Sequence, residues 1–128
     1  MASIDYADIV EAELTAHDIM ICTDCEGFNA SHSRGFATPD TRVVHFNKKM
    51  ATRATLHDFL HEVGHILKGH GKACRLRRFE KEGQAEEYAR ESMRAYGIPI
   101  SRKRAAEGAA YIKRMRRWGR NIAAGRGS

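Results

Sequence analysis

Residues 56–67 read LHDFLHEVGHIL and contain the motif H-E-x-x-H at positions 61–65. Positions four apart lie one above the other on a helix face, so His61 and His65 can direct two imidazole nitrogens at one metal ion. Glu62 lies beside them, where its carboxylate can act as general base on a water at the metal's open position. The motif therefore predicts a catalytic zinc site.

The residues around the motif favour a partly buried helix over a surface helix with scattered histidines. Thr55 is the predicted amino-terminal cap, and Gly69 or Gly71 is the predicted end. The apolar residues that recur at helical intervals are Leu56, Phe59, Leu60, Val63, Ile66 and Leu67. The motif thus falls in the middle of the predicted helix.

Two histidines leave a catalytic zinc site one protein ligand short. The segment from Arg78 to Tyr96 is predicted to form a helix. Its apolar stripe would consist of Ala85, Tyr88, Ala89, Met93 and Tyr96. Glu82 lies near the centre of this stripe and is the predicted third ligand, with Glu86 at the margin as the alternative. Either completes a His-His-Glu site for one Zn²⁺ ion, and the neighbouring His57 and His70 are expected not to be ligands.

A strand-like segment, VVHFN at residues 43–47, precedes the motif helix, and the segment EGQAEEYA follows it at residues 82–89. With these elements in this order, the chain resembles the ImmA/IrrE-type metallopeptidases of phages, mobile elements and bacterial stress regulation. The resemblance covers roughly residues 40–98. The second segment is similar to the family's E-x-E/Q-A-N-x-F-A signature, with Glu82 as its leading glutamate. Glu86 stands where the family often has asparagine, and Val63 where it usually has leucine.

The resemblance implies an α+β fold, a compact zincin-like domain with zinc held between two helices and a small sheet. The edge strand of that sheet would receive extended substrate backbone, and Val43, Val44 and His45 are the predicted edge. His45 would point toward the cleft and steady an oxyanion, or else be structural. The implied activity is zinc-dependent hydrolysis of peptide bonds in a specific cytoplasmic protein, such as a transcriptional repressor.

The length and composition fit one domain, because 128 residues that are 42% hydrophobic can form one modest core but not two. Residues 1–98 are predicted to form the catalytic core, and residues 99–128 a basic amphipathic helix and tail. Within the core, residues 3–19 are predicted to form a helix, and residues 26–41 an irregular loop.

Several features predict a cytoplasmic protein without a membrane segment. No apolar run is long enough to cross a bilayer, and the amino terminus is acidic where a secretory signal would be basic and then apolar. The odd number of cysteines, three, argues against a disulfide framework. Cys22 and Cys25 are expected to be ordinary thiols, and their C-x-x-C spacing leaves half of a structural zinc site or a redox pair as alternatives.

The positive charge is concentrated at the carboxyl end. Residues 99–128 contain nine Lys and Arg and one Glu, a net charge of +8, which leaves −2 for the first 98 residues of a chain whose total is +6. The predicted apolar stripe of this helix consists of Tyr111, Met115, Trp118 and Ile122. Clustered basic residues with an aromatic can bind phosphate backbones, so this helix predicts a nucleic-acid contact, with a solvated face or an acidic partner as alternatives. The contact residues would be Lys113, Arg114, Arg116 and Arg117. The competing function is therefore a nucleic-acid-binding or adaptor protein on a zincin-like scaffold.

Overall fold

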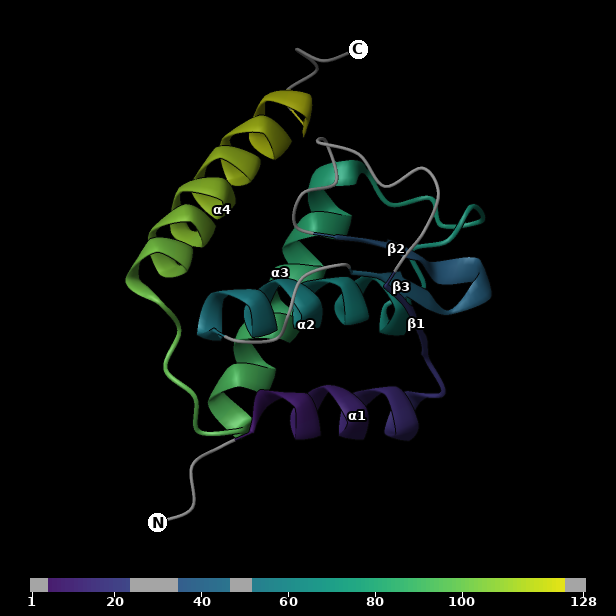
Figure 1. The fold of residues 1–128 in the computed structure, drawn as a ribbon. Helices are drawn as coiled ribbons and strands as arrows, with labels where there is room; N and C mark the ends of the chain where they lie inside the picture. Colours follow the sequence, from purple (N-terminus) through teal and green to yellow (C-terminus); the bar gives the residue numbers. More distant parts are fainter. Residues whose placement is uncertain (1–4, 24–34, 47–51, 124–128) are drawn as a thin grey trace.

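The computed structural model describes residues 5–23, 35–46 and 52–123, and beyond residue 110 it describes side chains only at Lys113, Arg114 and Arg117. In these residues there are four helices and a small three-stranded sheet, which packs against α2 (Figure 1). The elements in chain order are α1 (Tyr6–His17), β1 (Met20–Cys22), β2 (Phe36–Thr38), the 3-10 turn η2 (Pro39–Thr41), β3 (Val43–His45), α2 (Arg53–Leu67), α3 (Arg78–Ala95) and α4 (Arg102–Ala123). The predicted α+β class is confirmed.

The motif helix α2 begins three residues earlier than predicted and ends at a predicted glycine. Thr52 is the N-cap: its hydroxyl accepts from the Thr55 backbone N–H at 3.1 Å, and the Thr55 hydroxyl accepts from the Thr52 N–H at 3.1 Å. The prediction that Thr55 is the cap is wrong, because Thr55 instead supplies the reciprocal side chain of a capping box. At the other end, Gly69 has a φ of +70°, which glycine adopts without strain.

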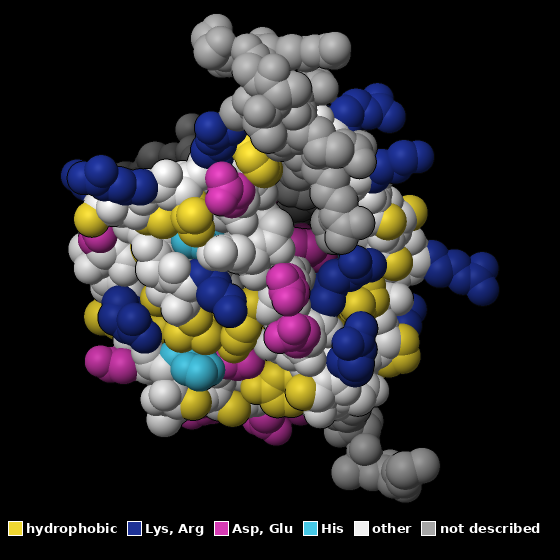
Figure 2. Space-filling model, turned by 180° about the vertical axis from the view of Figure 1, so that it is seen from behind, with side chains coloured by type: hydrophobic (Ala, Val, Ile, Leu, Met, Phe, Trp, Pro, Cys, Tyr) yellow, Lys and Arg dark blue, Asp and Glu magenta, His cyan; other side chains and the backbone are white. Residues whose placement is uncertain are grey.

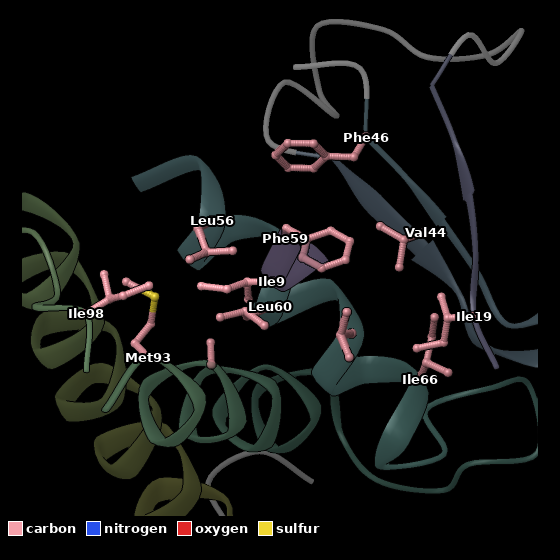
Figure 3. Close-up of a cluster of buried hydrophobic side chains, with 12 residues drawn as sticks. Ile9, Ile19, Val44, Phe46, Leu56, Phe59, Leu60, Ile66, Met93 and Ile98 are labelled. Carbon is pink, nitrogen blue, oxygen red and sulfur yellow. The ribbon is translucent and has the colours of Figure 1, made fainter. Parts of the chain in front are cut away.

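The apolar side of α2 forms the centre of the core (Figure 3). Leu56, Phe59, Leu60 and Val63 have no exposed surface, and neither do Val44 of β3 and Met93 of α3. Phe46, just after β3, packs edge-to-face on Phe59 with ring centroids 6.3 Å apart. Each such burial stabilises the fold by roughly 1.5–3 kcal/mol, so α2 is held in place by the whole domain.

Helix α3 crosses α2 at Gly64 (Figure 1). A Cβ at Gly64 would lie 2.9 Å from both the Cα and the carbonyl oxygen of Ala85, and 3.2 Å from the Cβ of Tyr88. Only a residue without a side chain lets the two backbones approach this closely. The crossing brings the first turns of α3, with Glu82 and Glu86, beside the motif.

The sheet has the order β1-β3-β2, with β1 parallel and β2 antiparallel to β3. The prediction that Val43, Val44 and His45 form an edge strand is wrong, because β3 pairs on both sides and is the central strand. The two flanking strands were not predicted. Both have only three residues, too few for a clear period of two, and β2 and η2 lie inside the segment predicted to be an irregular loop.

His45 lies on the face of the sheet that points away from α2. Val44 is fully buried against the core, and successive strand residues face opposite sides. The His45 ring stacks on Phe36 with centroids 4.2 Å apart, and its Nε2 lies 2.7 Å from the Thr38 hydroxyl in a hydrogen bond. The predicted oxyanion role is therefore wrong, and the structural alternative describes this residue.

A buried carboxylate ties α1 to α3. Glu13 is only 4% exposed, and it accepts hydrogen bonds from the hydroxyls of Tyr88 at 3.0 Å and Tyr96 at 3.0 Å. Nε2 of His17, one turn later on α1, lies 3.0 Å from a carboxylate oxygen of Glu13. Burial and the negative charge of Glu13 raise the pKa of Tyr96 to about 12 and also raise that of Tyr88. The two tyrosines therefore remain neutral donors to the carboxylate.

Helix α4 is fixed to the domain by its first two turns. The Ser101 hydroxyl accepts from the Arg104 backbone N–H at 3.2 Å, and the Arg104 guanidinium donates to Asp58 of α2 at 2.9 Å. Farther along, buried Gly108 packs beside Glu86 and Arg90 of α3. The predicted stripe of Tyr111, Met115, Trp118 and Ile122, and the side chain of Arg116, lie outside the residues whose side chains are described.

None of the described helices has an apolar stretch long enough to span a membrane.

Cys22, at the end of β1, is disulfide-bonded, and Cys25 lies outside the described residues. The expectation that it is an ordinary thiol is therefore wrong. Cys74, half-buried in the segment between α2 and α3, is a free thiol.

We predict that Gly64→Ala destabilises the protein, although alanine favours helix. Overpacking at the crossing costs roughly 1–3 kcal/mol, which exceeds the gain of about 1 kcal/mol that alanine brings over glycine inside a helix. Gly83→Ala is the matched control, because a Cβ at Gly83 of α3 meets nothing within 4 Å. Chemical denaturation should show a loss for Gly64→Ala and a small gain for Gly83→Ala. Equal stabilisation by both would contradict the close crossing.

Candidate metal centre

The two motif histidines and Glu82 come together beside the α2–α3 crossing. Each offers one ligand atom, and these atoms all lie within 4.8 Å of one another. The Nε2 atom of His61 is 2.8 Å from one oxygen of Glu82, and the Nε2 atom of His65 is 3.4 Å from the other. In the described part of the chain no other group of three such residues is found.

The donor set fits a zinc-type ion. Three protein ligands of the His-His-Glu kind, with a fourth position left open, are the arrangement of many catalytic zinc sites. Ligands about 2 Å from one ion lie ~3–4 Å apart, so the three atoms here need only small movements to share one ion. The half-buried side chains would hold that ion partly shielded from solvent.

The second ring nitrogen of His61 faces Glu86. His61 Nδ1 lies 3.1 Å from one oxygen of Glu86, whose other oxygen lies 2.6 Å from Nε2 of the fully buried His57. Glu86 thus lies on the opposite side of the His61 ring from Glu82 and is not part of the candidate metal group. A histidine that donates from Nδ1 to a carboxylate presents the lone pair of Nε2 to a metal. Glu86 is therefore placed to orient the His61 ring, and Glu82 is the glutamate within the candidate metal group.

The second ring nitrogen of His65 faces His70. The two Nδ1 atoms are 2.9 Å apart, and Nε2 of His70 lies 2.8 Å from the side-chain oxygen of Gln84 on α3. His70 is 7% exposed. The structure places neither His57 nor His70 in the metal group, in agreement with the sequence.

The histidines and glutamates of the group shift one another's pKa. Burial alone would lower the pKa of His61, but its hydrogen bonds to Glu82 and Glu86 outweigh burial and raise that pKa to about 10. Burial opposes the ionisation of both glutamates, yet the histidines lower the pKa of Glu86 to about 2 and that of Glu82 further. These shifts favour ionised carboxylates, the form that binds a divalent cation.

Glu62 is half-buried and follows His61 directly on α2. Burial raises the pKa of its carboxyl group to about 8, and the negative charges of Glu82 and Asp58 add to this effect while His61 opposes it. Glu62 therefore lies on the same helix as both candidate histidine ligands.

The chain matches no protein-family model, no curated protein and no solved structure. The resemblance to the ImmA/IrrE-type metallopeptidases therefore stays a prediction.

The sequence did not predict that His57, Glu86, His70 and Gln84 lie around the candidate ligands as their hydrogen-bonding partners; Glu86 was predicted only as the alternative third ligand. His57 and His61 are four residues apart, as are Glu82 and Glu86, and this spacing was a usable signal that His57 and Glu86 lie beside the candidate ligands. The contact between His70 and Gln84 left no signal in the sequence, because these residues belong to different elements that meet only in the folded chain.

We predict that Glu82→Gln abolishes stoichiometric zinc binding, because an amide is a poor substitute for the ligating carboxylate. Glu86→Gln should still bind one zinc per chain, with affinity weakened roughly 10–100-fold, as for the loss of a residue that orients a ligand. Metal content by elemental analysis and chelator competition would measure both. Glu87→Gln, on the exposed side of α3, is the control. The reverse pattern would make Glu86 the third ligand.

Proposed function

We propose that the protein is a zinc-dependent metallopeptidase of the ImmA/IrrE type with a zincin-like fold. The observation that supports this most directly is the grouping of His61, His65 and Glu82 with Glu62 beside them. A protein that only used the fold as a scaffold would have no need of a half-buried carboxyl group with a raised pKa at Glu62, directly after a residue of the candidate ligand set. The close crossing of α2 and α3 and the hydrogen-bonded second nitrogens of both histidines are further support.

In the proposed mechanism His61, His65 and Glu82 would hold one zinc ion, each histidine offering Nε2 and the glutamate a carboxylate oxygen. Zinc, when bound, would acidify the attacking water and polarise the scissile carbonyl. Glu62 would accept a proton from that water on its carboxylate and later deliver the proton to the leaving amine. Glu86 and His70 would keep the two imidazole rings oriented during turnover.

The substrate in this proposal is a folded or extended segment of a specific cytoplasmic protein, such as a transcriptional repressor. Extended substrate backbone can add to an open sheet edge. Of the two outer strands in the described sheet, β2 is the one that packs against α2. We therefore assign the substrate-binding edge to β2, residues Phe36–Thr38, in place of the central β3.

We predict that Glu62→Gln retains about one zinc per chain but loses peptidase activity by roughly 10²–10⁴-fold, the usual contribution of a general base. Cleavage of a peptide library made from proteins of the same cell, read by mass spectrometry, would measure the activity. Glu87→Gln should cleave like the wild type. Undiminished cleavage by the metal-loaded Glu62→Gln protein would exclude Glu62 as the base.

A second candidate function, nucleic-acid binding, is favoured by the outer surface of α4. Lys113, Arg114 and Arg117 are all exposed on this helix. Figure 2 shows dark blue Lys and Arg side chains projecting along the side of the molecule that α4 forms. Because the charge of the chain is concentrated here, α4 is the surface most suited to a phosphate backbone.

If α4 binds nucleic acid, replacing Lys113, Arg114 and Arg117 by glutamine should weaken the binding of duplex DNA. Losing three phosphate contacts should also flatten the slope of log affinity against log salt by about 3. Fluorescence anisotropy over a salt series would measure both quantities. The control removes the same charge from the exposed positions Lys68, Lys72 and Arg75 near the end of α2. Equal losses in both triple variants would show that only net charge matters, and this would contradict a specific role for α4.

A further inference from the structure

We propose that His70 is a positioning residue for the metal ligand His65, and that it fixes which nitrogen of the His65 ring faces the metal. The inference rests on the proposed zinc site. It assigns a role to a buried histidine outside the H-E-x-x-H motif, together with Gln84 and Asp40, which hold that histidine in place.

The backbone brings His70 to His65 through the end of α2. The N–H of Gly69 donates to the Ile66 carbonyl at 3.1 Å, and the N–H of His70 donates to the His65 carbonyl at 3.0 Å. This pair of bonds is a Schellman motif, and it requires the left-handed φ of +70° that Gly69 adopts. The residue after the glycine is thereby folded back over the last turn of the helix. Here that residue is His70, and its ring meets the ring of His65 with centroids 5.1 Å apart.

Two further contacts hold the segment that carries His70. Gln84 of α3 accepts from Nε2 of His70 at 2.8 Å. On the other side, Asp40 of η2 accepts from the Lys72 backbone N–H at 3.0 Å, and its carboxylate packs so closely on Gly71 that a Cβ there would overlap it. The His70 ring is therefore held by α2 and α3, and the residues that follow it by η2, with little of the His70 surface exposed.

One arrangement of protons on neutral imidazole rings suits a metal ion at His65. With the side-chain oxygen of Gln84 accepting from Nε2 of His70, Nδ1 of His70 is a bare acceptor. Nδ1 of His65 is then the donor in the 2.9 Å contact. Nε2 of His65 is left with its lone pair, on the side of the ring that faces Glu82. The chain from Gln84 through His70 thus presents the nitrogen that the metal needs.

His70 itself is a poor fourth ligand for the same ion. Its Nδ1 meets Nδ1 of His65, and this nitrogen lies across the ring from the Nε2 atom in the metal group. Its other nitrogen is engaged by Gln84. His70 therefore acts through His65 and not on the ion.

The experiment compares wild type with His70→Leu, His70→Asn and Gln84→Leu, using Zn²⁺ and Co²⁺ as probes. Leucine removes the acceptor, whereas asparagine retains an oxygen near the position of Nδ1. We expect His70→Leu to lower metal affinity by roughly 10–100-fold in chelator competition, His70→Asn to recover most of that loss, and Gln84→Leu to fall between them. Long-range ¹H–¹⁵N spectra of the zinc-loaded wild type should show His65 protonated at Nδ1 and metal-bound at Nε2. His45→Leu, which alters a half-buried, hydrogen-bonded histidine on the far face of the sheet, is the matched control.

The outcomes separate this inference from the proposed function. Wild-type protein that binds no zinc would overturn the proposed function, and this inference with it. Zinc binding by the wild type with equal affinity in His70→Leu, or a His65 ring bound through Nδ1, would overturn the role of His70 alone. If His70→Leu does not fold, His70→Asn and Gln84→Leu decide the matter. Loss of affinity in both leucine variants, with recovery by asparagine and no change in His45→Leu, would support it.

Discussion

The close contact of α2 and α3 at Gly64 is the constraint on which the rest of the structure depends. Two helices carrying ordinary side chains at their contact pack with axes about 8–10 Å apart, and the missing Cβ of Gly64 lets the Ala85 backbone come nearer. At that separation the short side chain of Glu82 reaches both His61 and His65. A residue with no functional group therefore determines whether the functional groups meet.

Polar groups are buried throughout this small domain, and nearly all of those described have partners. Glu13 accepts hydrogen bonds from two tyrosine hydroxyls, and Asp58 accepts one from Arg104. Each motif histidine has a polar partner at both ring nitrogens. Among the described residues, Nδ1 of His57 and Nε of Arg104 are the buried side-chain atoms without a hydrogen-bond partner. The other ring nitrogen of His57, Nε2, has a partner, because it lies 2.6 Å from a carboxylate oxygen of Glu86.

The features that the sequence predicted correctly depend on the spacing of residues close together in the chain. The period of the apolar residues predicted α2 and α3, and the spacing of four within the motif placed His61 and His65 on one face. The end of α2 at Gly69 followed from the special conformation of glycine. What could not be predicted depends on which elements meet in space. The three-residue strands carry too little pattern, the central position of β3 depends on two distant partners, and the meeting of His70 with Gln84 exists only after folding.

The candidate donor set lies on two consecutive helices within one short part of the chain. The three candidate ligands and their hydrogen-bonding partners all fall within residues 57–86. An ion that binds this group in the folded chain and not in the unfolded chain would stabilise the α2–α3 crossing by mass action. Metal supply during synthesis would then influence how much protein reaches the native fold.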